Sequence, residues 1–198
     1  MKKIPSVLER DWQGDRSRVV AELNPDCEWV MRGEGVATRQ WDGTAVRVRG
    51  GRLFARADAK RGETPPPGFE PCEDAPDPHT GHWPGWRPAH TGPEDQWLQE
   101  AFEASGGETL CDGTYEAIGP RIGGNPECVD PHRLVRHGAD VLRFDWAAKW
   151  AGDLYRNLIS YLWLARIEGI VWHHPDGRMA KIKRRDFGIP WPLPKDDQ

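Results

Sequence analysis

The sequence predicts an α+β domain built around antiparallel sheets. Short alternating segments are separated by turn residues, and only one long segment has a clear helical period. Thr44 to Arg49 alternates apolar and polar residues, and Gly50-Gly51 then turns the chain into residues 52–56. Residues 150–165 carry one apolar stripe at the spacing of an amphipathic helix. Meandering strands with few helices are typical of α+β domains.

Other segments fill in this outline. Residues 18–23 and 29–31 predict two strands joined by an Asn-Pro-Asp turn. Residues 62–93 are rich in Pro, Gly and His and predict a long surface loop. Residues 110–118 predict a further strand, which a Gly/Pro-rich turn at residues 119–126 follows.

Composition excludes several classes of protein. A hydrophobic content of 37% and a charged content of 29% are ordinary for a globular protein. No apolar run is long enough to span a bilayer, and the segment after Met1 lacks the apolar stretch of a secretory signal. We therefore expect a cytoplasmic protein without a membrane segment. Its 11 tryptophans favour ring-filled pockets or stacking surfaces.

The four cysteines form no Cys-x-x-Cys pair, so we expect no disulfide framework. Cys128 and His132, with His79 and His82, have residue types that bind zinc. Because they lack a second clustered pair, we interpret them as core thiols and loop histidines.

The net charge of −4 hides two basic segments. Residues 32–61 hold eight basic residues against three acidic ones, and residues 178–185 hold five basic residues and no acidic one. The two segments could converge on one phosphate-binding face or form two solvated strands.

Four separated motifs carry the chemistry. In chain order they are Gln40-Trp41-Asp42-Gly43-Thr44, Tyr115-Glu116-Ala117-Ile118-Gly119, Glu168-Gly169-Ile170-Val171 and Lys181-Ile182-Lys183. They resemble motifs I, III, IV and V of the covalent nucleotidyltransferases, the superfamily of ATP-dependent DNA and RNA ligases and mRNA capping enzymes. The ordered set is specific, although each motif alone is weak.

One branch of this superfamily is more similar still. Small RNA ligases that join 5′-phosphate to 3′-hydroxyl ends resemble this chain from about Val36 onward. The stretches that carry this resemblance are Arg56-Ala57-Asp58-Ala59-Lys60, Gly81-His82-Trp83-Pro84-Gly85-Trp86, Ile122-Gly123-Gly124-Asn125-Pro126, Ile167-Glu168-Gly169-Ile170-Val171-Trp172-His173 and Gly188-Ile189-Pro190-Trp191-Pro192.

The resemblance implies a three-step reaction with ATP and Mg²⁺. A lysine amine attacks the α-phosphate of ATP, and a lysine-AMP adduct forms as pyrophosphate leaves. AMP then passes to the RNA 5′-phosphate, and the 3′-hydroxyl finally displaces it. The first step requires an unprotonated amine, so burial and neighbouring cations must lower the pKa of the nucleophile.

The resemblance also implies residue roles. Gln40 occupies the nucleophile position, and Lys181 and Lys183 stabilise charge on the α-phosphate. Glu168 binds the metal, and Glu116 holds the metal or the ribose. The remaining nucleotide-binding candidates are Thr38, Asp42, Gly43, Arg56 and Lys60. Trp83 and Trp86 could stack on a base or ribose, or anchor the loop that contains them.

Gln40 departs from the Lys-x-Asp-Gly pattern of the family. An amide cannot attack phosphorus, and Arg39 is too basic to replace a lysine. We therefore expect the first step to be dead in this chain. Either Gln40 is an introduced inactivating substitution, or the chain is a natural pseudoenzyme that binds nucleotide or RNA ends. Retention of the other motif residues favours the substitution.

The last hairpin allows a geometric test. Lys181 and Lys183 share one strand face because they are two residues apart. They share it with Glu168 only if His173 pairs with Arg178, which leaves four loop residues. With a three-residue Pro-Asp-Gly loop the lysines would point away from Glu168. We predict the four-residue register.

The whole chain, residues 1–198, is expected to form a single nucleotidyltransferase domain without an OB-fold. The expected function is RNA end joining in RNA repair, by a monomer whose partner is RNA with 5′-phosphate and 3′-hydroxyl ends. A non-catalytic RNA-end sensor and an enzyme that transfers AMP to another protein are the alternatives. The adenine pocket of this fold is largely backbone, so only the resemblance favours ATP over GTP.

Overall fold

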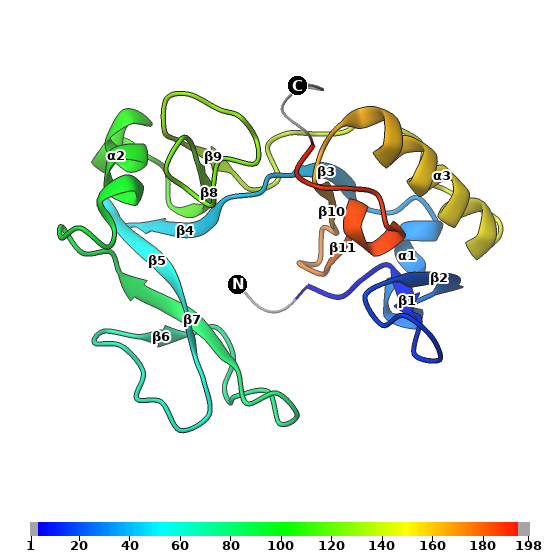
Figure 1. Cartoon of the computed structure of the whole chain (residues 1–198), viewed down its shortest axis with the longest axis horizontal. Coiled ribbons are helices and arrows are strands. Elements are labelled where there is room, and N and C mark those ends of the chain that lie inside the picture. Colours follow the sequence, from blue (N-terminus) through cyan, green and yellow to red (C-terminus); the bar gives the residue numbers. More distant parts are fainter. Residues whose placement is uncertain (1–3, 194–198) are drawn as a thin grey trace. The chain divides into compact units, whose positions relative to one another are not determined.

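The computed structural model describes residues 4–193 as two compact units (Figure 1). Unit 1 comprises residues 42–137. Unit 2 comprises residues 4–41 together with the chain from Gly138 onward. The backbone therefore passes from one unit to the other twice, after Trp41 and after His137.

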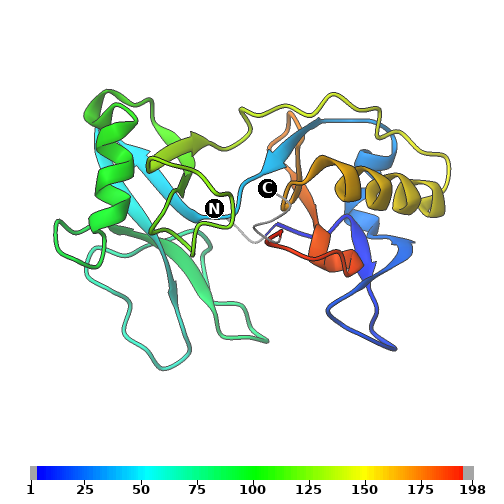
Figure 2. The ribbon, with the colours of Figure 1, turned by 45° about the horizontal axis from the view of Figure 1, so that its top comes forward.

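Unit 1 is built on a six-stranded antiparallel sheet with the strand order β6-β7-β5-β4-β8-β9. These strands are β4 (Thr44–Arg49), β5 (Arg52–Ala59), β6 (Glu70–Pro71), β7 (Trp83–Pro88), β8 (Gly113–Ile118) and β9 (Arg133–Arg136). In Figure 2 the long strand β5 runs beside β7, with which it pairs from Phe54 to Ala59.

One face of this sheet is covered by helix α2 (Gln96–Ala104). Alternate strand residues, among them Val46 and Val48, pack against Leu98 and Phe102 of that helix. Because strand side chains alternate, the intervening residues point to the opposite face. That opposite face is the one that carries polar and charged side chains such as Arg47.

Unit 2 contains a three-stranded antiparallel sheet of order β11-β10-β3 and a two-stranded sheet of β1 and β2. Its elements are β1 (Leu8–Arg10), β2 (Val19–Leu23), α1 (Glu28–Met31), β3 (Val36–Gln40), α3 (Ala151–Ala165), β10 (Gly169–His173) and β11 (Met179–Lys183). Short 3₁₀ helices occur at Pro25–Cys27 and Arg184–Phe187 of unit 2 and at Gly107–Thr109 of unit 1.

Helix α3 forms the core of unit 2 together with one face of the three-stranded sheet. Leu154, Leu158 and Leu162 are fully buried and belong to the same cluster as Ile170 and Ile182. The apolar stripe of residues 150–165 thus faces the sheet, as its period predicts. In the part of the chain that is described, no helix has the length and apolar character needed to cross a membrane.

The structure confirms the α+β class, the helix at 151–165 and the hairpin at Gly50-Gly51, where Arg49 pairs with Arg52. Three expectations were wrong. Trp29 and its neighbours are helical, because the Asn24 side chain accepts from the Asp26 N–H and starts a helical turn.

The other two corrections concern the middle of the chain. The expected loop at 62–93 contains β6 and β7, because Gly85 and the tryptophans on either side of it pair with β5 despite the neighbouring prolines. Gly85 allows Phe69 and β6 to approach β7 closely, since an added Cβ would overlap the Phe69 ring and the Glu70 carbonyl oxygen. Helix α2 was not predicted. Its three buried residues, Leu98, Ala101 and Phe102, are too few to show a helical period in the sequence.

Packing of α3 against the sheet is tested by removing one buried leucine. Leu158→Ala leaves a cavity where the side chain is fully buried, so we expect the free energy of unfolding to fall by about 2–5 kcal/mol. Leu164→Ala removes the same atoms from a side chain that is 78% exposed, and we expect a change within about 0.5 kcal/mol. Urea unfolding followed by circular dichroism measures both; equal losses would contradict the described orientation of α3.

Candidate functional site

Gln40, Gly169 and Lys183 lie in one row across the three strands of the unit 2 sheet. Gly169 at the start of β10 pairs with Gln40 at the end of β3 on one side. On its other side it pairs with Lys183 at the end of β11. Residues directly opposite in neighbouring strands point to the same face. Because glycine has no side chain, the Gln40 and Lys183 side chains flank an open position.

A second row lies two residues away on the same face. Val171 pairs with Thr38 on one side and with Lys181 on the other. The Thr38 side chain is buried, and its hydroxyl donates to the carbonyl of Val171 at 3.1 Å. The opposite face of the sheet packs into the core with α3, so Gln40, Lys181 and Lys183 all lie on the face away from that helix.

The register of the β10–β11 hairpin differs from the one predicted. His173 pairs with Met179, and the His174 N–H donates to the Arg178 carbonyl at 2.9 Å, which leaves the three-residue loop Pro175-Asp176-Gly177. The four-residue register was therefore wrong. The Asp176 carboxylate accepts from the Arg178 N–H at 2.9 Å, and Gly177 adopts a φ of +91°, so both favour the tighter turn.

Glu168 nevertheless forms an ion pair with Lys183. Strand alternation would separate them in this register, but Glu168 lies in a bend before the first residue of β10, so alternation does not govern its side chain. The Glu168 side chain is 7% exposed and that of Lys183 is 14% exposed. The expected meeting of these two residues is thus found, by a route other than the predicted register.

The electrostatic environment of Lys181 is unusual for a lysine. Burial, and next the positive charge of Lys183, lower the pKa of the Lys181 ammonium, while Glu168 acts in the opposite direction. Lys183 has its own carboxylate partner in Glu168. This face therefore holds two ammonium groups and one carboxylate, an arrangement that attracts an anion such as a phosphate.

The amide of Gln40 lies against the backbone of β10. Its Oε1 is buried and accepts no hydrogen bond within residues 4–193. A Cβ added at Gly169 would lie 3.2 Å from this oxygen and would overlap the carbonyl oxygen of Ile182. Gly169 is therefore required both for strand pairing and for the room that the residue at position 40 occupies.

In unit 1, Gly43 and Glu116 are brought together. The Gly43 N–H donates to Oε1 of Glu116 at 3.0 Å, and His137 Nε2 lies 2.9 Å from Oε2 of the same carboxylate. An added Cβ at Gly43 would overlap the carbonyl oxygen of Ala117, so only glycine fits here. His137 was not anticipated, since nothing in its neighbourhood distinguishes it from other loop histidines.

Asp42 is fixed through its backbone. Its N–H donates to the Glu127 carboxylate at 2.8 Å. Glu127 follows the Gly123-Gly124 turn, and a Cβ added at Gly123 would lie 3.9 Å from the Cα of Gly43. Glu127 is a further residue that sequence reasoning missed, because it has no motif around it.

Arg56 and Glu116 lie on the face of the unit 1 sheet that α2 does not cover, together with Arg47. The Arg56 guanidinium lies 5.4 Å from the ring centre of buried Trp86. Lys60 follows the end of β5 and is exposed. Arg47 could have been anticipated, since the alternation of Thr44 to Arg49 already puts it opposite Val46 and Val48.

Trp83 and Trp86, which lie in β7, act as anchors in this structure. Trp83 donates its indole N–H to the Glu73 carbonyl at 2.8 Å and contacts the Phe69 ring edge-on. Trp86 is buried under arginines rather than exposed for stacking.

The basic segment at 32–61 is divided between the units, and part of its charge is neutralised. Arg47 and Arg49 both form ion pairs with Glu70 at 2.5 Å. Arg32 pairs with Glu34 at 2.7 Å. Convergence of the two basic segments on one face stays a prediction.

No group of three or more His, Cys, Asp or Glu side chains that could hold a metal occurs among residues 4–193. His132 is buried, stacks on Trp97 and lies 2.7 Å from Glu100. Cys128 is exposed, so the expectation of a core thiol was wrong at this position. A magnesium ion needs no such cluster, because it usually binds through one or two carboxylates plus phosphates and water. The hard oxygens of Glu168 fit that mode.

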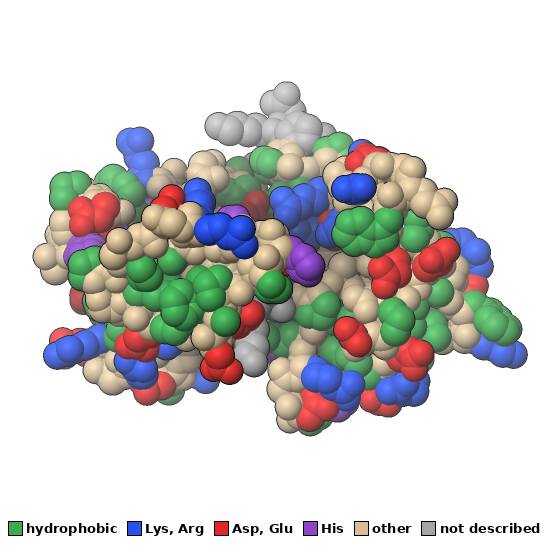
Figure 3. Space-filling view, turned by 90° about the horizontal axis from the view of Figure 1, so that it is seen from below, with side chains coloured by type: hydrophobic (Ala, Val, Ile, Leu, Met, Phe, Trp, Pro, Cys, Tyr) green, Lys and Arg blue, Asp and Glu red, His purple; other side chains and the backbone are tan. Residues whose placement is uncertain are grey.

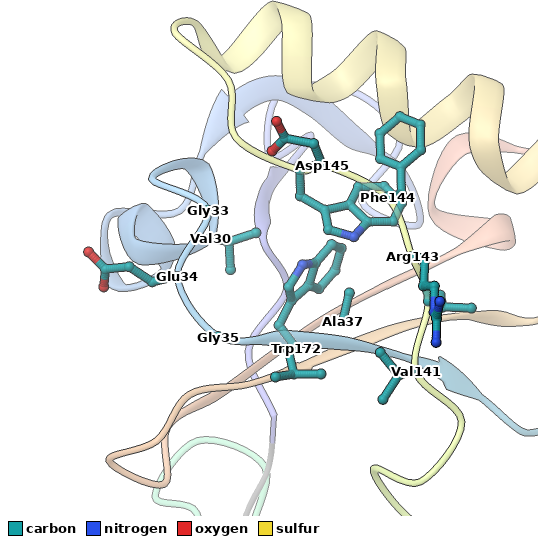
Figure 4. A pocket seen from close by; sticks show the side chains of 13 residues that line it. Val30, Gly33, Glu34, Gly35, Ala37, Val141, Arg143, Phe144, Asp145 and Trp172 are labelled. Atoms are coloured by element: carbon teal, nitrogen blue, oxygen red, sulfur yellow. The ribbon is translucent and has the colours of Figure 1, made fainter.

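A separate pocket of about 260 Å³ lies on the core side of the unit 2 sheet (Figure 4). Ala37, Trp172 and Phe144 are among its lining residues. None of the candidate site residues Thr38, Gln40, Glu168, Lys181 and Lys183 lines it. Among the described residues, the buried indole N–H groups of Trp146 and Trp172 have no hydrogen-bond partner. The pocket is thus distinct from the face that carries Gln40.

Comparisons with known proteins agree on one kind of enzyme. The family described as RNA ligase 1 matches residues 99–197, which is half of the chain. The RNA ligase 1 of Danio rerio is 29% identical over 152 residues, which cover 60% of this chain and 44% of that protein. The RNA ligase 1 of Mus musculus is 32% identical over 146 residues, which cover 58% of this chain and 43% of that protein.

The family match and these relatives define the class: the chain belongs to a family of RNA ligases. More particularly, it belongs to the RNA ligase 1 family. The chain matches less than half of the length of these relatives.

Close backbone packing at Gly43 is tested by adding one methyl group. We expect Gly43→Ala to lower the free energy of unfolding by about 1–3 kcal/mol or more, because the new Cβ overlaps a backbone carbonyl. Gly152→Ala is the matched control, since its Cβ would meet only the end of Arg156 at 3.9 Å. There the helix gains stability, by about 0.5 kcal/mol. Thermal unfolding measures the stability of both variants. A Gly43→Ala variant as stable as its parent would contradict the described backbone contact at Gly43.

The coupling between the two lysines predicts a measurable titration shift. Lys183→Met removes the neighbouring cation and frees Glu168, so we expect the pKa of Lys181 to rise toward the ordinary lysine value. Lysine side-chain NMR over a pH series measures it, with Lys149→Met as a control distant in sequence. An unchanged Lys181 titration would contradict the described proximity of these side chains.

The lowered pKa of Lys181 also makes the free energy of unfolding depend on pH. The unfolded chain binds this proton more tightly than the folded chain does, so the contribution of Lys181 to the free energy of unfolding falls as pH drops from about 10.4 through the folded pKa.

Proposed function

We propose that this chain is the adenylating part of an RNA ligase that joins RNA 5′-phosphate and 3′-hydroxyl ends with ATP, and that Gln40 stands where the nucleophilic lysine belongs. The observation that supports this most is the row of Gln40, Gly169 and Lys183, with Lys181 one row away. A nucleophile at position 40 would share a sheet face with two ammonium groups. Membership of the RNA ligase 1 family supports the same reaction.

We further propose that both units belong to one nucleotidyltransferase domain covering residues 1–198. The antiparallel sheets and few helices are compatible with that fold. The motif residues are distributed over both units, Gln40 and Lys183 in unit 2 and Glu116 in unit 1. In this proposal, unit 2 contributes the residues of the nucleophile row and unit 1 contributes Glu116.

With lysine at position 40, the first step would proceed as follows. The neutral amine attacks the α-phosphorus of ATP, a nitrogen–phosphorus bond forms, the bond to pyrophosphate breaks, and the nitrogen loses its proton. Neighbouring ammonium groups lower the pKa of the attacking amine and thereby raise its unprotonated fraction. Lys181 and Lys183 stabilise the negative charge that develops on the α-phosphate.

The other candidate residues bind rather than react. Glu116, held by the Gly43 N–H and His137, accepts hydrogen bonds from the ribose. Arg56 and Lys60 contact phosphates of the nucleotide or of the RNA end. Glu168, with Glu116 as second candidate, would hold Mg²⁺, which when bound supplies a Lewis acid for the transferring phosphate.

For Gln40 itself we propose a lysine replaced by substitution, because the surrounding motif residues are those of an active ligase. A non-catalytic sensor of RNA ends is the second candidate function, and the observation that favours it is Gln40 itself. We also propose action on broken RNA in the cytoplasm, with ATP rather than GTP as the nucleotide, by a monomer.

A paired labelling assay tests the proposal. We expect the Gln40→Lys form, incubated with ATP labelled at the α-phosphate and Mg²⁺, to acquire covalent AMP, while the Gln40 form does not. We expect only the lysine form to join 5′-phosphorylated RNA ends. Gel autoradiography measures the label and the joined product. Binding of ATP by both forms without labelling of either would leave the sensor function instead.

The final sealing step gives an independent readout. It starts from pre-adenylated RNA and requires no lysine adduct, so the Gln40 form should seal such a donor to a 3′-hydroxyl end. Sealing by the Gln40→Lys form alone would show that position 40 also acts after the first step.

A further inference from the structure

A basic pocket of about 590 Å³ lies in unit 2, away from the motif residues. It is bounded by the segment before β2 and by the segment that follows β11. Four arginines and one carboxylate supply its charged lining: Arg10, Arg16, Arg18, Arg185 and Asp186. The charged side chains of the lining therefore have a net charge of +3.

Part of this lining is held rigidly. Arg10 forms an ion pair with Asp186 at 2.8 Å, and the Asp186 side chain is only 4% exposed. Arg18 donates to the backbone carbonyl of Arg185 at 3.0 Å. Its guanidinium lies so close to Gly188 that a Cβ there would overlap it, and Gly188 has a φ of +79°. These contacts fix one part of the pocket, where the two chain segments meet.

Two of the arginines have no acidic partner in the described chain. The side chains of Arg16 and Arg185 are exposed, and neither forms an ion pair with a carboxylate of residues 4–193. Arg16 lies 5.9 Å from the ring of Trp12. Their charges are available to an anion, and guanidinium groups bind phosphate oxygens with paired hydrogen bonds.

The remaining wall is apolar. Ile189, Pro190 and Trp191 line it. A pocket lined by arginines and by a tryptophan suits a nucleotide unit, whose phosphate can pair with guanidinium groups and whose base or ribose can contact an aromatic ring. Basic and acidic side chains are intermingled on the face seen in Figure 3, so a local cluster of this kind matters more than a broad basic surface.

We propose that this pocket binds the backbone of the RNA substrate, at a phosphate that is not the reacting one. The inference rests on the proposed function for the identity of the strand. Arg185 is two residues beyond Lys183, in the 3₁₀ helix that continues β11. A strand held here would therefore be bound directly after the strand that carries Lys181 and Lys183.

The test uses Arg16→Ala and Arg185→Ala, alone and combined, in the Gln40→Lys chain and in the Gln40 chain. Arg156→Ala is the matched control: it removes the same group from an exposed helix position of the same unit, outside the pocket. Fluorescence anisotropy with single-stranded 5′-phosphorylated RNA gives Kd over a series of salt concentrations. Covalent labelling from ATP without RNA is measured in parallel, and circular dichroism monitors folding.

We expect the double variant to bind RNA on the order of ten-fold more weakly or worse, and its salt slope to fall by about 1.4, since each phosphate contact on a single strand contributes roughly 0.7. Labelling of the Gln40→Lys chain by ATP should not change. The Arg156→Ala control should bind RNA like its parent.

Other outcomes overturn the inference in distinguishable ways. RNA affinity unchanged in the double variant would refute it and leave the ligase function intact. Lost labelling with unchanged RNA binding would assign the pocket to the phosphates of ATP. An equal loss in Arg156→Ala would reduce the effect to general charge. Absent labelling in the parent Gln40→Lys chain would instead refute the proposed function. RNA binding by the arginine variants of the Gln40 chain would still test whether the pocket binds RNA.

Discussion

The space left by the missing side chain at position 169 is the constraint on which the unit 2 site depends. β10 pairs on both edges, and Gly169 is the residue where both neighbouring strands present their polar ends. Any Cβ there would overlap the Ile182 carbonyl, so β11 could not keep its pairing. The hydrophobic side of the same strands is filled by α3, which fixes the sheet from behind. A short gap in the side-chain layer thus leaves room between Gln40 and Lys183.

A second close backbone contact at a glycine occurs in unit 1. Gly43 and Gly169 each follow an acidic residue, and each tolerates a backbone contact that no other residue could. At Gly43 the freed N–H fixes the carboxylate of Glu116, and at Gly169 the preceding Glu168 turns out of the strand toward Lys183. In isolation, an acidic residue followed by glycine indicates only a turn. Here each glycine lets a neighbouring backbone carbonyl come close, and each acidic residue lies at a strand boundary.

Local rules predicted what is decided locally. The Gly50-Gly51 hairpin and the helix at 151–165 follow from turn chemistry and period, and both are found. Family order identified Glu168 and Lys183, which do meet. Features decided by distant partners escaped prediction: β7 exists because it pairs with β5 in spite of its prolines. The hairpin register was missed because one Asp176 hydrogen bond and a left-handed Gly177 favour the shorter loop over strand alternation.

The two passages of the chain between units have a consequence for synthesis. All six strands of the unit 1 sheet lie between Trp41 and His137, so that sheet has every pairing partner once this stretch has left the ribosome. β3 is made earlier, yet its neighbour β10 follows only after the whole of unit 1. Strand β3 therefore lacks its partner strand β10 until unit 1 has been synthesised. The sheet that bears Gln40 can close only after β10 and β11 have been made, and it pairs strands that are far apart in the sequence.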